Sequence, residues 1–142
     1  MPAHRALVVD DDPDTVVYLT SYLEDNGYEV RSTADAAHAL ALLEIYRPEV
    51  ILADVLLPGR SGLDLLVTVR RDPRWRDIAV VMITGMEEIL QHDCQSYLVS
   101  HEGVAGPDAV LGKPIEPSAL LAVLSELFRR KAAVATAAAA VR

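Results

Sequence analysis

The sequence has one cysteine, few aromatic residues and too little positive charge to balance its acids. Because Cys94 is alone, an internal disulfide and a cysteine-rich zinc site are both excluded. Aromatic residues make up 5% of the chain, so its core must be built mainly from aliphatic side chains. The net charge of -8 argues against a nucleic-acid-binding surface, because phosphate binding needs a basic stripe.

Long apolar segments are also missing. No stretch of the chain approaches membrane-spanning length. The N-terminal segment MPAHRALVV lacks the apolar core of a secretory signal peptide, because aspartates begin at residue 10. The 142 residues are 51% hydrophobic, with a mean hydropathy of +0.22, which suits one packed domain. We therefore expect a soluble, cytoplasmic protein that binds neither nucleic acid nor membrane.

The chain does contain a regular alternation of short apolar runs and longer amphipathic segments. Strands are predicted at residues 6–9, 28–31, 50–53, 79–83 and 109–111. Helices are predicted at residues 13–26, 36–46, 62–71 and 87–99, and from residue 117 onward. Apolar strands that alternate with helices are typical of a parallel sheet covered on both faces. The predicted fold class is therefore α/β, with a doubly wound, five-stranded parallel sheet.

The end of the chain differs in composition from the rest. One domain accounts for residues 1–128, and residues 129–142 form an Ala-rich helix extension or flexible tail. Only one helix and this tail follow Lys113, so we expect no DNA-binding or catalytic output domain in this chain. The tail is also compatible with helix pairing in a homodimer.

Charged and hydroxyl side chains follow four of the five predicted strands. They are Asp10, Asp11 and Asp12 after the first strand, Asp54 after the third, Thr84 after the fourth and Lys113 after the fifth. In open α/β sheets, ligands bind beyond the carboxyl ends of the strands. We therefore expect an acidic cluster, a hydroxyl and an ammonium group in one cleft.

Such a cluster of carboxylates needs a cation. Two carboxylates about 4 Å apart repel by about 4 kcal/mol at an effective dielectric constant of about 20, and one lysine does not cancel several such pairs. Oxygen ligands without convergent histidines or cysteines favour Mg²⁺. A metal, a second cation, a hydroxyl and a carboxylate nucleophile are the parts that phosphoryl transfer requires.

Four motifs in this order, LVVDDD, VILADVLLPGRSG, VVMITG and LGKP, resemble the receiver domain of two-component response regulators, the CheY-like receivers. The resemblance covers residues 4–128. Asp54 follows Asp11 by 43 residues, and Thr84 follows Asp54 by 30. The resemblance implies a flavodoxin-like (βα)5 fold and a phosphorylation-dependent switch. Its implied partners are a histidine kinase or histidine phosphotransfer protein and an unknown downstream protein target.

The resemblance also implies residue roles. Asp54 is the phosphoacceptor and a Mg²⁺ ligand. Asp11 binds Mg²⁺ directly, Asp10 helps, often through water, and the backbone carbonyl of Leu56 supplies a further ligand. Thr84 hydrogen-bonds the bound phosphoryl group.

After the last strand, the resemblance implies that Lys113 is the cation that pairs with the phosphoryl group and that Pro114 is a cis-proline.

Two features depart from the family pattern. Val110 stands where an aromatic switch residue is common, and the 29 residues from Thr84 to Lys113 predict an extended loop within SHEGVAGPDAV. The apolar Leu56 and Met86, which flank the site in the family, imply a long-lived phosphoryl group.

Other interpretations remain open for individual residues and for the chain. Asp12 and Asp14 suit a helix N-terminus. The basic run Arg70, Arg71, Arg74 and Arg76 around Trp75 is interpreted as a solvated helix end. The chain could also be an aspartate-nucleophile phosphatase of the haloacid dehalogenase type, since DPDTV superficially resembles its DxD motif. A third hypothesis is a binding module of this fold that works without phosphorylation.

Overall fold

The computed structural model describes residues 4–57, 61–85 and 104–140, with side chains through residue 134. Five parallel strands form one sheet in the order β2-β1-β3-β4-β5. The strands are β1 (Arg5–Val9), β2 (Glu29–Thr33), β3 (Val50–Asp54), β4 (Ala79–Thr84) and β5 (Ala109–Gly112). The described helices are α1 (Pro13–Asp25), α2 (Ala36–Tyr46), α3 (Gly62–Arg71) and α5 (Pro117–Ala140). The predicted α/β, doubly wound, flavodoxin-like fold is confirmed.

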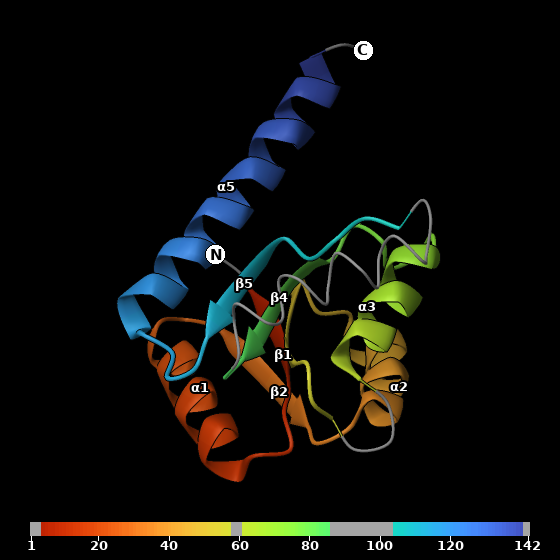
Figure 1. Ribbon diagram of the computed structural model, residues 1–142. Helices are drawn as coiled ribbons and strands as arrows, with labels where there is room; N and C mark the ends of the chain where they lie inside the picture. The colour runs from red at the N-terminus through yellow and green to blue at the C-terminus, as the bar shows by residue number, and fades with distance from the viewer. Residues whose placement is uncertain (1–3, 58–60, 86–103, 141–142) are drawn as a thin grey trace.

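Helices cover both faces of the sheet: α1 and α5 lie on one side, and α2 and α3 on the other (Figure 1). Successive side chains along a strand point to opposite faces of the sheet, so each strand contributes to the core under both layers of helices. Leu7 and Val9 pack with α2 and α3, whereas Ala6 and Val8 pack with α1 and α5. The central strands β3 and β4 are therefore buried along their whole length and apolar up to their last residue, as a sheet covered on both sides requires.

Short polar side chains set the starts of the first three helices. Asp12 caps α1, Asp35 caps α2 and Ser61 caps α3, and each accepts a hydrogen bond from a backbone N–H of the first turn. Ser61 and Asp64 form a reciprocal capping box. The helix α2 ends at Arg47, whose left-handed φ of 54° is unusual for a residue other than glycine or asparagine.

Several predicted bounds shift by one or two residues. The second strand begins at Glu29 rather than residue 28, because the Tyr28 N–H donates to the Leu23 carbonyl and so completes the end of α1. Asn26 is the C-cap of α1 rather than a helical residue. The predicted helix at 87–99, the Pro58–Gly59 turn and Met86 lie outside the described residues.

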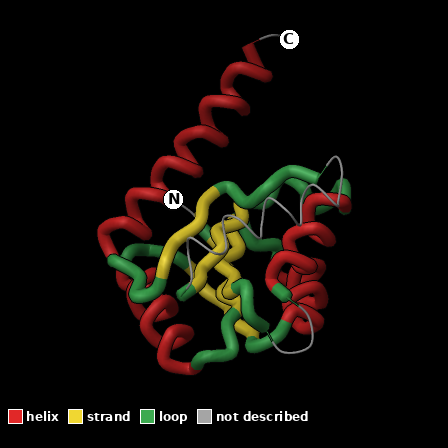
Figure 2. Tube along the Cα trace, in the orientation of Figure 1, coloured by secondary structure: helices red, strands yellow, loops and turns green. Residues whose placement is uncertain are grey.

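The last helix extends well past the sheet. Residues 117–140 form one continuous helix, and its distal half projects away from the body of the molecule (Figures 1 and 2). Among the residues that the structure describes, no helix is both long and apolar enough to cross a membrane. The Ala-rich part of the chain continues this helix through residue 140.

The interpretation of the basic run as a solvated helix end was wrong for Arg70, whereas Arg71, Arg74 and Arg76 are exposed. The Arg70 side chain is only 7% exposed, so it is not part of a solvated helix end. Its Nη2 lies 2.7 Å from Asp108 Oδ2, and its Nη1 donates to the carbonyl oxygens of Arg76 and Ile78. Asp108 Oδ2 also accepts from the Val80 N–H at 2.8 Å. Arg70 thus joins the end of α3 to the starts of β4 and β5.

Candidate functional site

The strand ends bring the predicted residues to one edge of the sheet. In the register, Val9 is opposite Ala53, Asp54 is opposite Ile83, and Thr84 is opposite Gly112. The residues that follow β1 and β5, Asp10 and Lys113, therefore lie beside the ends of β3 and β4. This edge includes the point between β1 and β3 where the strand order reverses, which is where ligands bind in such sheets.

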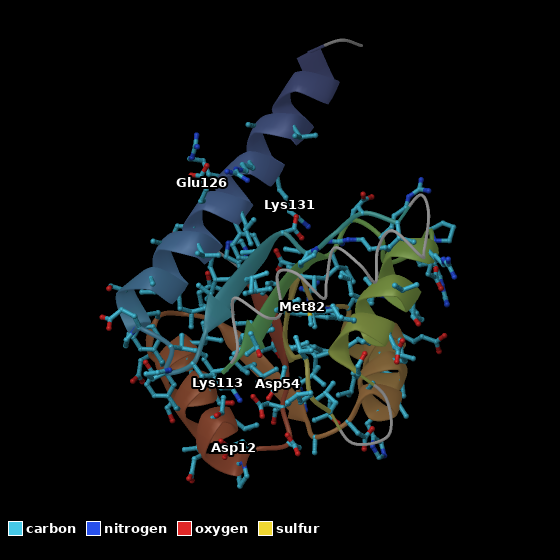
Figure 3. All side chains as sticks on the ribbon, viewed as in Figure 1. Asp12, Asp54, Met82, Lys113, Glu126 and Lys131 are labelled. Atoms are coloured by element: carbon cyan, nitrogen blue, oxygen red, sulfur yellow. The ribbon has the colours of Figure 1, made fainter. Side chains whose placement is uncertain are left out.

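Lys113 connects the two buried carboxylates. Its Nζ lies 2.9 Å from Asp54 Oδ2 and 3.0 Å from Asp10 Oδ2, and Figure 3 shows Lys113 and Asp54 side by side. Partial burial alone would lower the pKa of Lys113, but its contacts with the carboxylates of Asp54 and Asp10 outweigh it and raise that pKa. The ammonium group is thus held in its charged form next to Asp54.

Asp54 is 8% exposed and is held from a second side by its own loop. The Leu56 N–H donates to Asp54 Oδ1 at 3.0 Å, while Lys113 contacts Oδ2. The Val55 N–H donates to the Ile83 carbonyl at 3.2 Å, which continues the pairing of β3 with β4 past the strand end. The Asp54 carboxylate is therefore oriented by two contacts before any ligand binds.

Asp10 is the most deeply buried acid of the cluster, at 2% exposure. Burial raises its pKa, although the Asp12 N–H and Lys113 act in the opposite direction. Asp10 Oδ1 accepts from the Asp12 N–H at 2.9 Å. Asp10 Oδ2 is in ion-pair range of Lys113 but has no partner in hydrogen-bond geometry among the described residues. This buried oxygen faces the Lys113 ammonium and still has a lone pair free for a further cation.

The donor set fits a small, hard cation. Asp10, Asp11 and Asp54 each offer a carboxylate oxygen, and these three oxygens lie within 4.8 Å of one another. Asp11 is exposed, so an ion could retain water on that side. Mg²⁺ binds oxygen at about 2.0–2.1 Å and usually keeps several waters, which suits two buried carboxylates with a third at the rim.

The acids nearest α1 have a different role. Asp12 Oδ1 accepts from the Asp14 N–H at 3.0 Å, and Asp12 Oδ2 accepts from the Thr15 hydroxyl at 3.0 Å. These bonds, led by the one from Thr15, lower the pKa of Asp12. The helix-capping interpretation of Asp12 is therefore confirmed, and Figure 3 places Asp12 at the start of α1.

Thr84 and the last strand complete the edge. Thr84 is 4% exposed at the end of β4, and its carbonyl accepts from the Lys113 N–H at 2.8 Å. The peptide bond between Lys113 and Pro114 is cis, as the resemblance implies. Val110 is half-buried in β5 opposite Met82, so an aliphatic side chain occupies the position where the family often has an aromatic one.

Gly62 is a positioning residue that the sequence reasoning missed. A Cβ atom at Gly62 would lie 2.2 Å from the Asp54 carbonyl oxygen and 2.9 Å from Met82 Cε. The Gly62 N–H donates to the Val55 carbonyl at 2.8 Å, so α3 begins directly against the backbone of the phosphoacceptor candidate. The Ser61–Gly62 pair before an apolar helix was a local signal for a close approach, but it did not identify the partner.

Comparison with known proteins agrees with this geometry. The family model described as the response regulator receiver domain matches residues 6–125. The chain belongs to the response regulator receiver family. Members of this family act as signalling switches rather than as catalysts of metabolism. The match covers the strands, the acidic cluster and Lys113, and it ends within α5.

Two curated relatives differ in length. The DNA-binding dual master transcriptional regulator RpaA of Synechocystis is 33% identical over 126 residues, which is 89% of this chain and 49% of RpaA. A 14.6 kDa protein from Leptolyngbya boryana is 34% identical over 84% of this chain and 86% of its own length. The chain therefore spans about half the length of several curated relatives and most of the length of another.

Solved structures share the same fold. A response regulator from Chloroflexus aurantiacus is 33% identical, with a TM-score of 0.74 over 88% of this chain and 97% of that one. The chemotaxis response regulator CheY4 of Vibrio cholerae is 27% identical, with a TM-score of 0.75 over 88% of this chain and 98% of that one. The likeness therefore covers nearly all of each solved chain and 88% of this one.

Proposed function

We propose that this receiver accepts a phosphoryl group on Asp54 from a phosphohistidine of a histidine kinase or histidine phosphotransfer protein. An oxygen of Asp54 forms a bond to phosphorus as the phosphorus–nitrogen bond of the donor breaks, and its electron pair returns to the histidine nitrogen. The observation that carries the proposal is Lys113, whose ammonium lies 2.9 Å from Asp54 and 3.0 Å from Asp10. A cation in this position would stabilise the charge on the transferred oxygens.

Asp10, Asp11, Asp54 and the Leu56 carbonyl are proposed to hold Mg²⁺. When bound, Mg²⁺ would neutralise the phosphoryl oxygens as the transfer proceeds. The spacing of the three carboxylates and the desolvated Asp10 oxygen support this ligand set. Thr84, at the end of β4, is proposed to donate its hydroxyl hydrogen bond to the phosphoryl group.

Phosphorylation would then change the affinity of the chain for a downstream protein target. Residues 1–128 are proposed to form the receiver domain, and residues 129–142 an extension of α5. The protein is proposed to act in the cytoplasm. Its only chemistry would be its own phosphorylation and dephosphorylation. Leu56 is exposed and apolar and cannot orient a hydrolytic water, so the phosphoryl group is expected to persist beyond a few seconds.

Intact-mass measurement tests the central step. The purified chain is incubated with acetyl phosphate, a small phosphoryl donor, with and without Mg²⁺. We expect the mass of one phosphoryl group to be added in the presence of Mg²⁺ and not after chelation. The variant Asp54→Asn should stay unmodified while keeping its fold, because asparagine preserves the shape of the side chain.

Asp12→Ala separates this proposal from the phosphatase hypothesis. The Asp12 side chain is used by the N-cap of α1, so this variant should lose helix stability but still be phosphorylated on Asp54. Turnover of a phosphate ester that is lost in Asp12→Ala and retained in Asp54→Ala would instead identify a phosphatase. An adduct that persists in Asp54→Asn would refute the assignment of the phosphoacceptor.

A further inference from the structure

A second cavity lies at the opposite edge of the sheet from Asp54. It has a volume of about 550 Å³ and is formed by the end of α2 and the turn that precedes β4. We call it the basal groove, and its lining residues are Leu43, Glu44, Arg47, Pro48, Arg74, Trp75 and Ile78. Val50 and Ala79, which begin β3 and β4 just after these segments, are paired in the register. The basal groove is therefore separated from the phosphorylation site by the length of the strands.

The basal groove combines an apolar floor with a tryptophan. Leu43 and Pro48 are buried, whereas Ile78 and Trp75 are half-buried and remain partly open to solvent. Trp75 is the only tryptophan of the chain. Tryptophan and arginine are the residues most often found at energetic centres of protein interfaces, where an aromatic ring buries a large area with few rotatable bonds. A half-exposed tryptophan in a cavity is thus suited to receive an apolar side chain.

Arg74 holds the tryptophan in place. Its guanidinium lies 4.3 Å from the centre of the Trp75 ring, and it forms ion pairs with Glu44 at 3.1 Å and Asp72 at 2.8 Å. The positive charge of Arg74 is therefore already matched by two carboxylates, and the aromatic ring is fixed before any partner binds. Such preorganisation reduces the entropy lost on binding.

Arg47, by contrast, has an unmatched charge. Its backbone completes α2, with the N–H bonded to the Leu43 carbonyl and the carbonyl accepting from Arg5 Nε at 2.9 Å. Within the described part of the chain, its guanidinium makes no hydrogen bond or ion pair. The left-handed φ of 54° would favour glycine, so backbone geometry does not account for an arginine at this position.

The charge available to a partner in the basal groove is that of Arg47. Glu44 and Asp72 already neutralise Arg74, so Arg47 is the one charge of the groove lining without a counter-ion among the described residues, in a chain whose net charge is -8. An acidic partner would be repelled by most of the surface and attracted here, which favours one orientation of encounter. A nucleic acid or membrane surface would need a broad basic region, which this acidic chain does not provide.

We propose that the basal groove is a docking site for an acidic peptide segment of a partner protein. The segment places an apolar side chain against Trp75 and a carboxylate on Arg47. This docking is independent of the chemistry at Asp54.

Fluorescence of Trp75 tests the proposal on the full-length chain. The probe is a short synthetic peptide of glutamates around one central leucine, and the control probes replace the glutamates with glutamines or with lysines. We expect a saturable change in Trp75 fluorescence with the acidic peptide and none with the control peptides. Arg47→Met should weaken its binding about tenfold, as expected for the loss of one charge-assisted hydrogen bond. Arg129→Met, on α5, removes the same charge from a residue that does not line the groove and should leave the affinity unchanged.

Arg47→Gly distinguishes docking from a structural role. Because glycine suits the left-handed backbone, this variant should raise the melting temperature by about 3 °C and still lose the peptide. A fall in melting temperature together with unchanged binding would overturn the proposal. The absence of saturable binding up to millimolar peptide, or equal binding of the glutamine or lysine probes, would overturn it as well.

Discussion

The amino ends of the parallel strands meet at one edge of the sheet, the amino edge, and their carboxyl ends meet at the other, the carboxyl edge. Both edges carry acidic and basic side chains, but in different proportions. At the amino edge, Arg70 pairs with Asp108, and Arg74 pairs with Asp72 and Glu44. At the carboxyl edge, Asp10, Asp11 and Asp54 lie close together, and one ammonium, that of Lys113, pairs with Asp10 and Asp54. Three carboxylates and one ammonium leave two negative charges unmatched there.

The difference in charge balance suits the amino edge to a structural role and the carboxyl edge to binding a ligand. At the amino edge, the contacts of Arg70 with Asp108 and the Ile78 carbonyl fix how α3, β4 and β5 meet without any ligand. Unmatched carboxylates at the carboxyl edge raise the free energy of the ligand-free protein, because like charges in a partly buried site repel. A divalent cation and a phosphoryl group would relieve this repulsion, so local instability is a mark of function here. The predictions below test the contrast from the largest expected effect to the smallest.

Gly62→Ala should have the largest effect, because it forces the backbone at the carboxyl edge to move. The added methyl group would meet the Asp54 carbonyl oxygen at 2.2 Å, and a backbone atom cannot swing away. We expect a loss of about 3 kcal/mol in the free energy of unfolding and a large fall in the rate of phosphorylation. Chemical denaturation and intact mass measure the two effects.

Gly85→Ala is the matched control for Gly62→Ala. Among the described residues, no atom lies within 4 Å of a Cβ at Gly85, and its φ is not in the left-handed region. Its free energy of unfolding should change by less than about 0.5 kcal/mol. Equal destabilisation by the two substitutions would contradict the role assigned to the close approach at Gly62.

Arg70→Met should destabilise the amino edge without disabling the site. Removal of the guanidinium leaves Asp108 without its ion pair, although the Val80 N–H still donates to it. We expect a loss of about 2–3 kcal/mol, somewhat below the usual effect of breaking a buried pair, because Asp108 is partly exposed. Denaturation should show partial recovery in Arg70→Met/Asp108→Asn, and the folded variant should still be phosphorylated.

Acidification should affect the two edges in opposite directions, because the pKa of Glu49 is lowered and that of Asp10 is raised. Partial burial of Glu49 opposes ionisation, but hydrogen bonds from His4 and the Arg5 N–H lower its pKa below the usual 4.5. Glu49 therefore stabilises the fold above about pH 4.5 and loses this contribution as the pH falls through its folded-state pKa. Burial raises the pKa of Asp10, so its protonation at low pH favours the folded state.

Denaturation in metal-free buffer between about pH 7 and pH 4 measures these contributions. Glu49→Gln should reduce the loss of stability on acidification. Asp10→Asn should increase that loss, since it removes the group whose protonation favours folding. Identical pH profiles in the two variants would show that the edges do not differ in this way.

Much of this molecule could be predicted from local sequence signals. Strand ends in a parallel sheet meet at one edge, so Asp10, Asp54 and Lys113 could be brought together from their positions after apolar runs. The helix α2 was predicted with its observed bounds because its caps and apolar spacing are local. Residues 87–99 lie outside the described residues, so that predicted helix stays a prediction.

The parts that could not be predicted depend on contacts between distant segments. Arg70 was interpreted as solvated because its partners, Asp108 and the Ile78 carbonyl, come from other elements. Gly62 is required by the Asp54 carbonyl oxygen, which no local pattern reveals. The metal-ligand role of the Leu56 carbonyl also stays a prediction, whereas its N–H contact with Asp54 is observed.

Calorimetric titration with Mg²⁺ tests most directly whether the unmatched charge at the carboxyl edge is a metal site. We predict one Mg²⁺ per chain, an affinity reduced at least tenfold in Asp54→Asn and in Asp11→Asn, and an unchanged affinity in folded Arg70→Met. No binding by the unmodified chain at millimolar Mg²⁺, or equal affinity in Asp54→Asn, would contradict the account.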